Sequence, residues 1–251
     1  MMRPFALQFR NQLLGFVREP VAATFNLAVP FMIVIVQALA YGDQVYSDGH
    51  TRFRMVDALG VTTGVMFIMI IGLFGMGIGL ASLIESRVLA GSSLRPGGPG
   101  LVMSAYALVL LVLVLLGWAV SYLVLWLGWR ATPPALPLAV LGVAILGIAV
   151  FLALGVCVAA VAGTPRSTQG VCSMIFFPLL FLSGAIFPIS TFPDALQALA
   201  VWLPGYRLME ALSPLWAGGQ RTDLGSALYL VIALVVAVVL ARWLLRRRED
   251  V

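Results

Sequence analysis

Long apolar runs dominate the pattern of hydrophobic and polar positions along the chain. Six stretches are apolar almost throughout, and a helix needs about 20 such residues to cross a hydrocarbon core of about 30 Å. Backbone polar groups in lipid must be satisfied within the spanning segment, so each stretch predicts a helix. We expect these six spans at residues 24–41, 59–83, 101–127, 136–162, 170–187 and 225–245.

Two segments depart from this pattern. In residues 1–20, Phe5, Phe9, Leu13 and Phe16 recur at helical spacing with polar residues between them, which is typical of an amphipathic helix on the membrane surface. Residues 188–222 are too polar for a span, too apolar for a free loop and interrupted by prolines. We predict short outer re-entrant helices there. The predicted fold is an all-α membrane protein, with residues 1–251 forming a single domain.

Composition supports a membrane protein. Of the residues, 62% are hydrophobic and 10% are charged, and the mean hydropathy is +1.07, which leaves too little charge to cover a soluble domain. The net charge of +5 comes from arginines at the ends of apolar runs, so it indicates membrane topology rather than nucleic-acid binding.

The arginines also predict the orientation. In the six-span arrangement, ten lie on one side and five on the other, and the arginine-rich side is expected to be cytoplasmic. The first side holds Arg3, Arg10, Arg18, Arg87, Arg95, Arg166, Arg242, Arg246, Arg247 and Arg248, and the second holds Arg52, Arg54, Arg130, Arg207 and Arg221. An even number of spans places both termini in the cytoplasm.

Few residues offer catalytic or binding chemistry. The expected spans carry no carboxylate or arginine away from their ends, and His50 and the two cysteines have no metal-ligand spacing. We therefore expect no catalytic, cofactor-binding or metal site. The chain contains no lysine, which excludes a P-loop within it. Ser183-Gly184 is compatible with an intramembrane serine protease, but a turn at a helix break is the simpler interpretation.

Glycines gather in the second expected span. Gly75 and Gly79 have the spacing that lets two helix backbones approach closely, and Gly72 precedes them by one turn. These three residues predict helix packing, either within the chain or between subunits, and we favour packing within the chain.

The order of several motifs resembles one family. Arg18-Glu19-Pro20 ends the first helix, Pro30 lies in the following span, and the run from Phe176 to Pro188 contains LSGAIFP. Phe192-Pro193, Pro204-Gly205-Tyr206-Arg207 and Glu210-Ala211-Leu212 then follow in order. This order is similar to that of the membrane subunits of type-2 ATP-binding-cassette exporters, the ABC-2 permease family, which includes multidrug, antibiotic-resistance and polysaccharide exporters.

The resemblance implies a transporter subunit in a bacterial plasma membrane that is not itself an enzyme. Two copies, or one copy and a related permease, would pair and work with two separate ATPase subunits carrying ATP and Mg²⁺. The residues implied to couple to the ATPase are Arg10, Arg18, Glu19, Glu85, Ser86 and Arg87. The second cytoplasmic loop departs from the usual family pattern, so Glu85 and Arg87 are equally well explained as flanks of a span. The resemblance also implies an outer gate, formed by Ser183, Gly184, Phe187, Pro188, Phe192 and Pro193.

The expected function is export of a hydrophobic or amphiphilic compound such as a drug, an antibiotic or a lipid-like molecule. Chain length and the LSGAIFP run favour drug export, with a polysaccharide or lipid-linked glycan as the alternative cargo. From other classes, an intramembrane enzyme and a membrane scaffold remain open.

Overall fold

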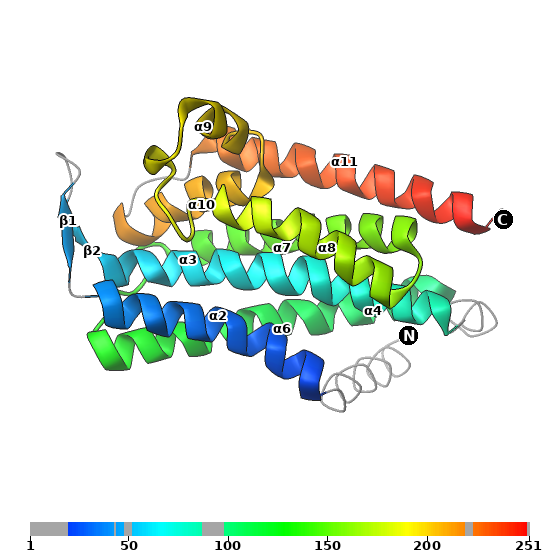
Figure 1. The fold of residues 1–251 in the computed structure, drawn as a ribbon, viewed down its shortest axis with the longest axis horizontal. Coiled ribbons are helices and arrows are strands. Elements are labelled where there is room, and N and C mark those ends of the chain that lie inside the picture. Colours follow the sequence, from blue (N-terminus) through cyan, green and yellow to red (C-terminus); the bar gives the residue numbers. More distant parts are fainter. Residues whose placement is uncertain (1–19, 43, 48–51, 87–97, 219–222, 250–251) are drawn as a thin grey trace.

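The structure is a computed structural model that describes residues 20–42, 44–47, 52–86, 98–218 and 223–249. It is an elongated bundle of roughly aligned helices (Figure 1). The elements, in chain order, are α2 (Pro20–Tyr41), β1 (Val45–Ser47), β2 (Arg52–Arg54), α3 (Met55–Ile70), the π-helix η1 (Ile71–Gly75), α4 (Met76–Glu85), α6 (Gly98–Trp129), α7 (Pro137–Ala162), α8 (Pro165–Phe181), the 3₁₀-helix η2 (Ile189–Thr191), α9 (Asp194–Ala200), α10 (Pro204–Ser213), the π-helix η3 (Pro214–Gly218) and α11 (Leu224–Glu249).

Four helical segments in the described residues are long and apolar enough to cross a membrane. They are Met55–Glu85, Gly100–Trp129, Pro137–Ala162 and Leu224–Arg247. The expectation of six spans is thus supported for four. The other two expected spans coincide with α2 and α8. In α2, the apolar helical part Pro30–Tyr41 is shorter than these four segments. The 17 residues of α8 extend about 25 Å at 1.5 Å per residue, which is short of the bilayer core.

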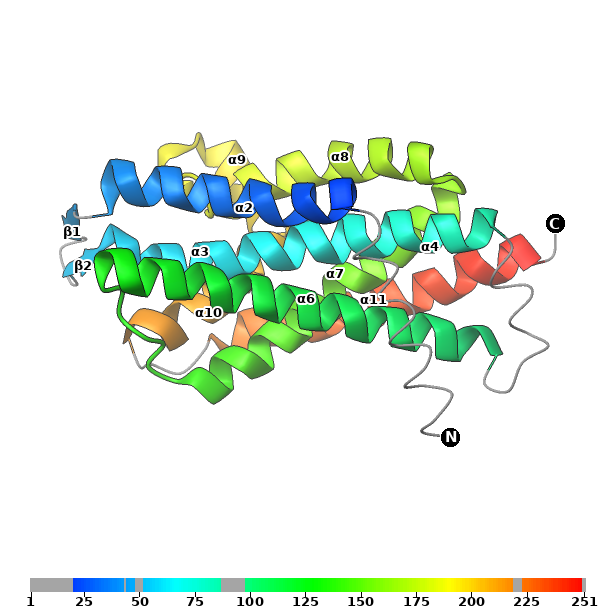
Figure 2. The same cartoon turned by 90° about the horizontal axis from the view of Figure 1, so that it is seen from below.

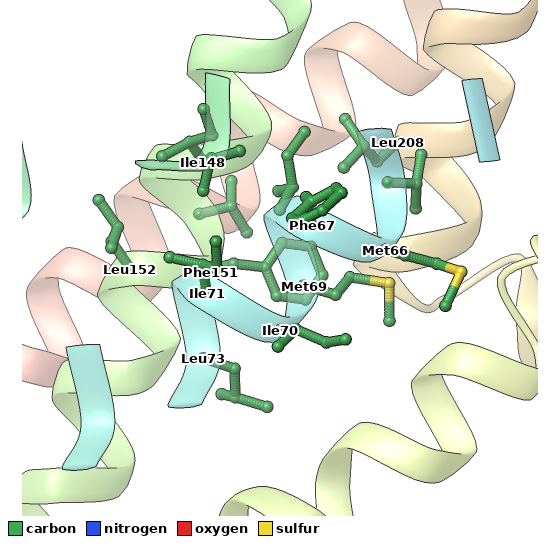
Figure 3. Packing of buried hydrophobic residues seen from close by; sticks show 14 of the residues in the cluster. Met66, Phe67, Met69, Ile70, Ile71, Leu73, Ile148, Phe151, Leu152 and Leu208 are labelled. Carbon is green, nitrogen blue, oxygen red and sulfur yellow. The ribbon is translucent and has the colours of Figure 1, made fainter. Parts of the chain in front are cut away.

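The segment α3–η1–α4 is the central helix of the bundle. It packs against α2, α6, α7 and α8, and Figure 2 shows α3 running between α2 and α6. Nearly every residue of α3 is buried. Figure 3 shows how side chains such as Met66, Phe67 and Met69 meet Phe151 of α7 and Leu208 of α10. Because this helix is apolar on all faces, burial among other helices is its natural position.

A two-stranded hairpin, which the sequence pattern did not predict, lies at the end of the bundle opposite the C-terminus (Figure 1). β1 and β2 pair antiparallel with Val45 opposite Arg54. Valine, tyrosine and phenylalanine in the two strands favour extended backbone. Arg54 donates a 2.8 Å hydrogen bond to the Trp129 carbonyl, which ties the hairpin to the end of α6. We call this the hairpin end of the bundle, and the opposite one the C-terminal end.

The expected fifth span differs in its bounds from the helix observed. α8 begins at Pro165 rather than at residue 170 and ends at Phe181 rather than at residue 187. Pro165 occupies the first turn, and the Thr164 hydroxyl accepts a 3.3 Å hydrogen bond from the Ser167 amide. A threonine cap followed by proline is a helix-start signal, and it accounts for the earlier beginning.

Candidate functional site

The centre of the bundle contains an irregular turn where α3 passes into α4. Residues Ile71–Gly75 form a π-helix, whose wider ring leaves some carbonyls out of the regular helical pattern. Two side chains from other helices donate to carbonyls in this turn. The Tyr106 hydroxyl of α6 donates to Gly75 at 2.9 Å, and the Cys172 thiol of α8 lies 3.6 Å from the Leu73 carbonyl oxygen. The turn is therefore held by side chains from two neighbouring helices.

The three glycines predicted for helix packing lie in or beside this turn and face other helices of the same chain. A methyl group added at Gly72 would lie 2.6 Å from the Cβ of Phe151, and one at Gly75 would lie 3.0 Å from Leu110. One at Gly79 would collide with the Tyr106 hydroxyl. The backbone of α7 approaches closely as well, since a methyl at Gly155 would lie 2.8 Å from the Gly72 carbonyl oxygen. Small residues let these backbones come together.

The predicted gate residues begin at the turn after α8. Ser183 is fully buried; its hydroxyl donates to the Leu180 carbonyl at 2.7 Å and accepts from the Ala185 amide at 3.2 Å. Gly184 has a φ of +80°, a conformation that favours glycine because it has no Cβ. The serine hydroxyl is thus used within the turn, as in a helix cap.

The remaining gate residues lie on the surface beyond this turn. Phe187 is 49% exposed, and its ring stacks on that of Phe181 with centroids 6.4 Å apart. Pro188 and Pro193 are exposed and flank η2. The Phe192 carbonyl accepts a 2.8 Å hydrogen bond from the Gln197 side chain of α9. The six predicted gate residues therefore lie along one segment of the chain, which runs from the buried Ser183 to the start of the peripheral helix α9.

Helix α10 is inserted into the core rather than lying on the surface. It contacts α3, α7, α8 and α11. Leu208, Ala211 and Leu212 are fully buried, and a methyl group added at Gly147 of α7 would lie 2.6 Å from Leu208. The segment 189–218 thus combines a peripheral helix, α9, with a deeply packed one, α10.

Arg207 connects α9, α10 and α11, a role that its place in a family motif and in the arginine count did not predict. Its Nε donates to the Val201 carbonyl at 2.8 Å and its Nη1 donates to the Ser226 hydroxyl at 3.4 Å. The guanidinium carbon lies 5.5 Å from the centroid of the Tyr229 ring. A signal was present in the sequence, because a charged residue in an apolar segment needs partners.

Asp223 caps α11 next to this group. Its carboxylate accepts hydrogen bonds from the amides of Ser226, at 2.9 Å, and Gly225, at 3.3 Å. Hydrogen bonds from the hydroxyl and amide of Ser226, then from Gly225, hold the pKa of the Asp223 carboxyl below its ordinary value. Arg207, Ser226 and Asp223 thus form one polar chain that joins α10 to the start of α11.

Two of the six predicted coupling residues lie in the described part of the chain. Glu85 and Ser86 are exposed at the end of α4, and the Ser86 hydroxyl donates to the Ser82 carbonyl at 2.6 Å. They lie at the C-terminal end of the bundle with the start of α8 and the end of α11 (Figure 1). Arg10, Arg18, Glu19, Arg87 and His50 fall outside the described residues, as do residues 1–19 of the interfacial helix expected at 1–20.

These features define a helical membrane protein whose buried interior is almost entirely apolar. Among the described residues, the buried polar or charged ones are Asp57, Thr62, Thr63, Ser121, Thr168, Ser183 and Ser226, and Asp57 sits at the first turn of α3. The model of the ABC-2 type transporter family matches residues 5–215. The chain belongs to this family, as its motifs indicated. The family is that of transporter membrane components, which lack an ATPase domain of their own and normally work with an ABC ATPase subunit.

Similarity to individual proteins is confined to part of the chain. Nodulation protein J of Rhizobium leguminosarum bv. viciae is 34% identical over 121 residues, which are 48% of this chain and 45% of that protein. Nodulation protein J of R. leguminosarum bv. trifolii is 32% identical, and that of Rhizobium meliloti (strain 1021) is 31% identical, each over 121 residues that are 48% of this chain and 44% of the relative. The matched region spans less than half of each relative.

Proposed function

We propose that this chain is the permease subunit of an ATP-driven exporter for a hydrophobic or amphiphilic compound. Membership of the ABC-2 type transporter family carries this proposal. The interior of the described bundle supports it physically: the one buried ionisable side chain among the polar residues there, Asp57, accepts a 2.8 Å hydrogen bond from the Thr132 amide at the hairpin end. A carrier coupled to protons or ions generally needs ionisable groups in mid-membrane. The energy for transport would therefore come from a partner.

The proposed assembly contains two permeases, each with six spans, and two ATPase subunits. If α2 and α8 are counted as spans, both termini would lie on one side, and the distribution of arginines favours the cytoplasm for that side. The ATPases would then bind at the C-terminal end of the bundle, where Glu85 and Ser86 are exposed. The segment from Ser183 to Pro193, with α9 and α10, would close the pathway at the hairpin end.

The cargo is proposed on chemistry alone. The exposed faces of the described membrane-length helices carry many large apolar side chains, which suits drugs, antibiotics and lipid-like molecules. A polysaccharide or lipid-linked glycan is the alternative, and the relatives are named for nodulation rather than for a drug. Both cargo classes therefore belong in the test.

The direct test is co-expression of the full chain with its candidate ATPase, reconstitution in vesicles and measurement of ATP hydrolysis against a panel of apolar drugs, lipids and glycans. We expect stimulation by one cargo class and none when the ATPase lacks its P-loop lysine. Failure of the two subunits to assemble, or hydrolysis indifferent to the permease, would contradict the proposal. Turnover of a compound by the permease without the ATPase would instead support an intramembrane enzyme.

A further inference from the structure

The last helix carries a continuous exposed stripe that ends in arginines. Leu228, Ile232, Val235 and Val239 recur every three or four residues, so they share one face of α11, and each is more than half exposed. Trp243 and Arg246 continue the same face toward the C-terminal end of the bundle. The stripe is thus apolar for most of its length and changes to aromatic and then basic at its end.

The opposite face of α11 is packed, and no other described residue of the chain covers the stripe. Leu230, Ala237 and Ala241 are buried, and the Cys157 thiol of α7 lies 3.4 Å from the Ala237 carbonyl oxygen. Of the four membrane-length helices, α11 is the least covered by the rest of the described chain. In Figure 1 it runs along one edge of the bundle.

The end of the stripe concentrates positive charge. Arg242, Arg246 and Arg247 are all exposed within the last two turns of α11, and the guanidinium carbon of Arg247 lies 4.0 Å from the centroid of the Trp243 ring. Tryptophan prefers the depth of the lipid headgroups, and arginine binds phosphate oxygens through two parallel N–H groups. The partial negative charge at a helix C-terminus favours the same cations.

We propose that this stripe binds an anionic phospholipid, with the phosphate held by Arg242, Arg246 and Arg247 and the acyl chains lying along Val235 and Val239. The chemistry of each part matches one part of such a lipid: an apolar track for the chains, an interfacial aromatic at the junction and a basic group for the headgroup. The proposal does not rest on the identity of the cargo or on coupling to an ATPase, so the proposed function can fail while this proposal stands.

The test titrates phosphatidylglycerol and phosphatidylcholine into the purified full chain in detergent and counts bound lipids by native mass spectrometry. We expect tighter binding of the anionic lipid and a loss of about fivefold in its affinity for each arginine replaced by glutamine, largest in the triple variant R242Q/R246Q/R247Q. Arg130→Gln, at the hairpin end, and Arg166→Gln, at the C-terminal end but on α8, are matched controls and should change little.

Three outcomes would overturn the proposal. The first is equal binding of both lipids, and the second is an unchanged anionic preference in the triple variant. The third is binding of glycerol phosphate or inorganic phosphate as tight as that of the anionic lipid, which would show that the arginines bind a free anion and that the apolar stripe contributes nothing. If the triple variant kept its lipid but lost a second copy or the ATPase, the stripe would be a protein interface instead.

Discussion

The Nε of Arg207 donates a 2.8 Å hydrogen bond to the carbonyl oxygen of Val201, just beyond the end of α9. The same guanidinium reaches Ser226 and lies over Tyr229, and the Tyr229 hydroxyl donates to the Trp202 carbonyl. Arg207 of α10 and Tyr229 of α11 therefore together fix the end of the peripheral helix α9 relative to α11. If α9 moves during transport, these contacts must break.

Replacing Arg207 by glutamine should loosen α9 and lower transport. A hydrogen bond made by a charged group contributes about 1.5–3 kcal/mol, so we expect a loss of about 2 kcal/mol in the free energy of unfolding. Arg207→Lys should recover little, since an ammonium cannot match the planar geometry of the guanidinium. Thermal unfolding in detergent and cargo-stimulated ATP hydrolysis measure the two effects.

Arg130→Gln is the control for this substitution, because Arg130 is an exposed arginine at the hairpin end. It should leave both measurements nearly unchanged. If Arg207→Gln behaved like this control, Arg207 would be a surface charge without a positioning role.

Gly72→Ala should destabilise the bundle strongly. The new methyl would lie 2.6 Å from the Cβ of Phe151. The backbones at Gly72 and Phe151 can move apart only if η1 or α4 separates from α7. Overpacking of this kind costs about 1–3 kcal/mol. Gly142→Ala in α7 is the matched control, because nothing lies within 4 Å of the added methyl there. The control should be neutral or stabilising, by up to about 1 kcal/mol, because alanine favours a helix more than glycine does. Equal melting temperatures for the two variants would refute close packing at Gly72.

The sequence sufficed to locate most of the helices because lipid imposes length and apolarity on each span. Residues 101–127 and 136–162, for example, fall within α6 and nearly within α7. It also indicated the family, through the ordered prolines and aromatics near LSGAIFP. Runs of this kind are local signals that need no knowledge of neighbouring helices.

Contacts between distant segments could not be predicted in this way. Tyr106 and Gly75 are 31 positions apart, and no local pattern indicates that the tyrosine donates to this carbonyl or that the turn ending at Gly75 is a π-helix. The hairpin was missed for a related reason: its strands are three residues each, too short for alternation to show. Arg207 was noted in a motif, but its partners lie in two other parts of the chain: Val201 follows α9, and Ser226 and Tyr229 belong to α11.

Tyr106→Phe should weaken the π-turn while preserving packing. The ring remains, but the Gly75 carbonyl loses its 2.9 Å hydrogen bond, at a cost of about 1 kcal/mol. Hydrogen–deuterium exchange should rise in the peptide containing residues 71–79 and stay level in α7. A uniform rise across the bundle would show general destabilisation, and no change at all would show that the hydroxyl does not support the turn.

The stabilisation supplied by Asp223 should depend on pH. Its pKa is lowered in the folded protein, chiefly by the hydroxyl and amide of Ser226, so the folded state favours the carboxylate. The contribution is then fully present above the unfolded pKa of about 3.9 and is lost as the pH falls through the lower folded value. We expect Asp223→Asn to unfold at a lower temperature than the unmodified chain at pH 7, and the difference to shrink below about pH 4. Asp194→Asn, in the first turn of α9, is the comparison variant. It tests whether an exposed aspartate at the start of another helix gives the same pH-dependent difference in unfolding temperature. A difference that stayed constant from pH 7 to pH 3 would show that the cap acts through shape rather than charge.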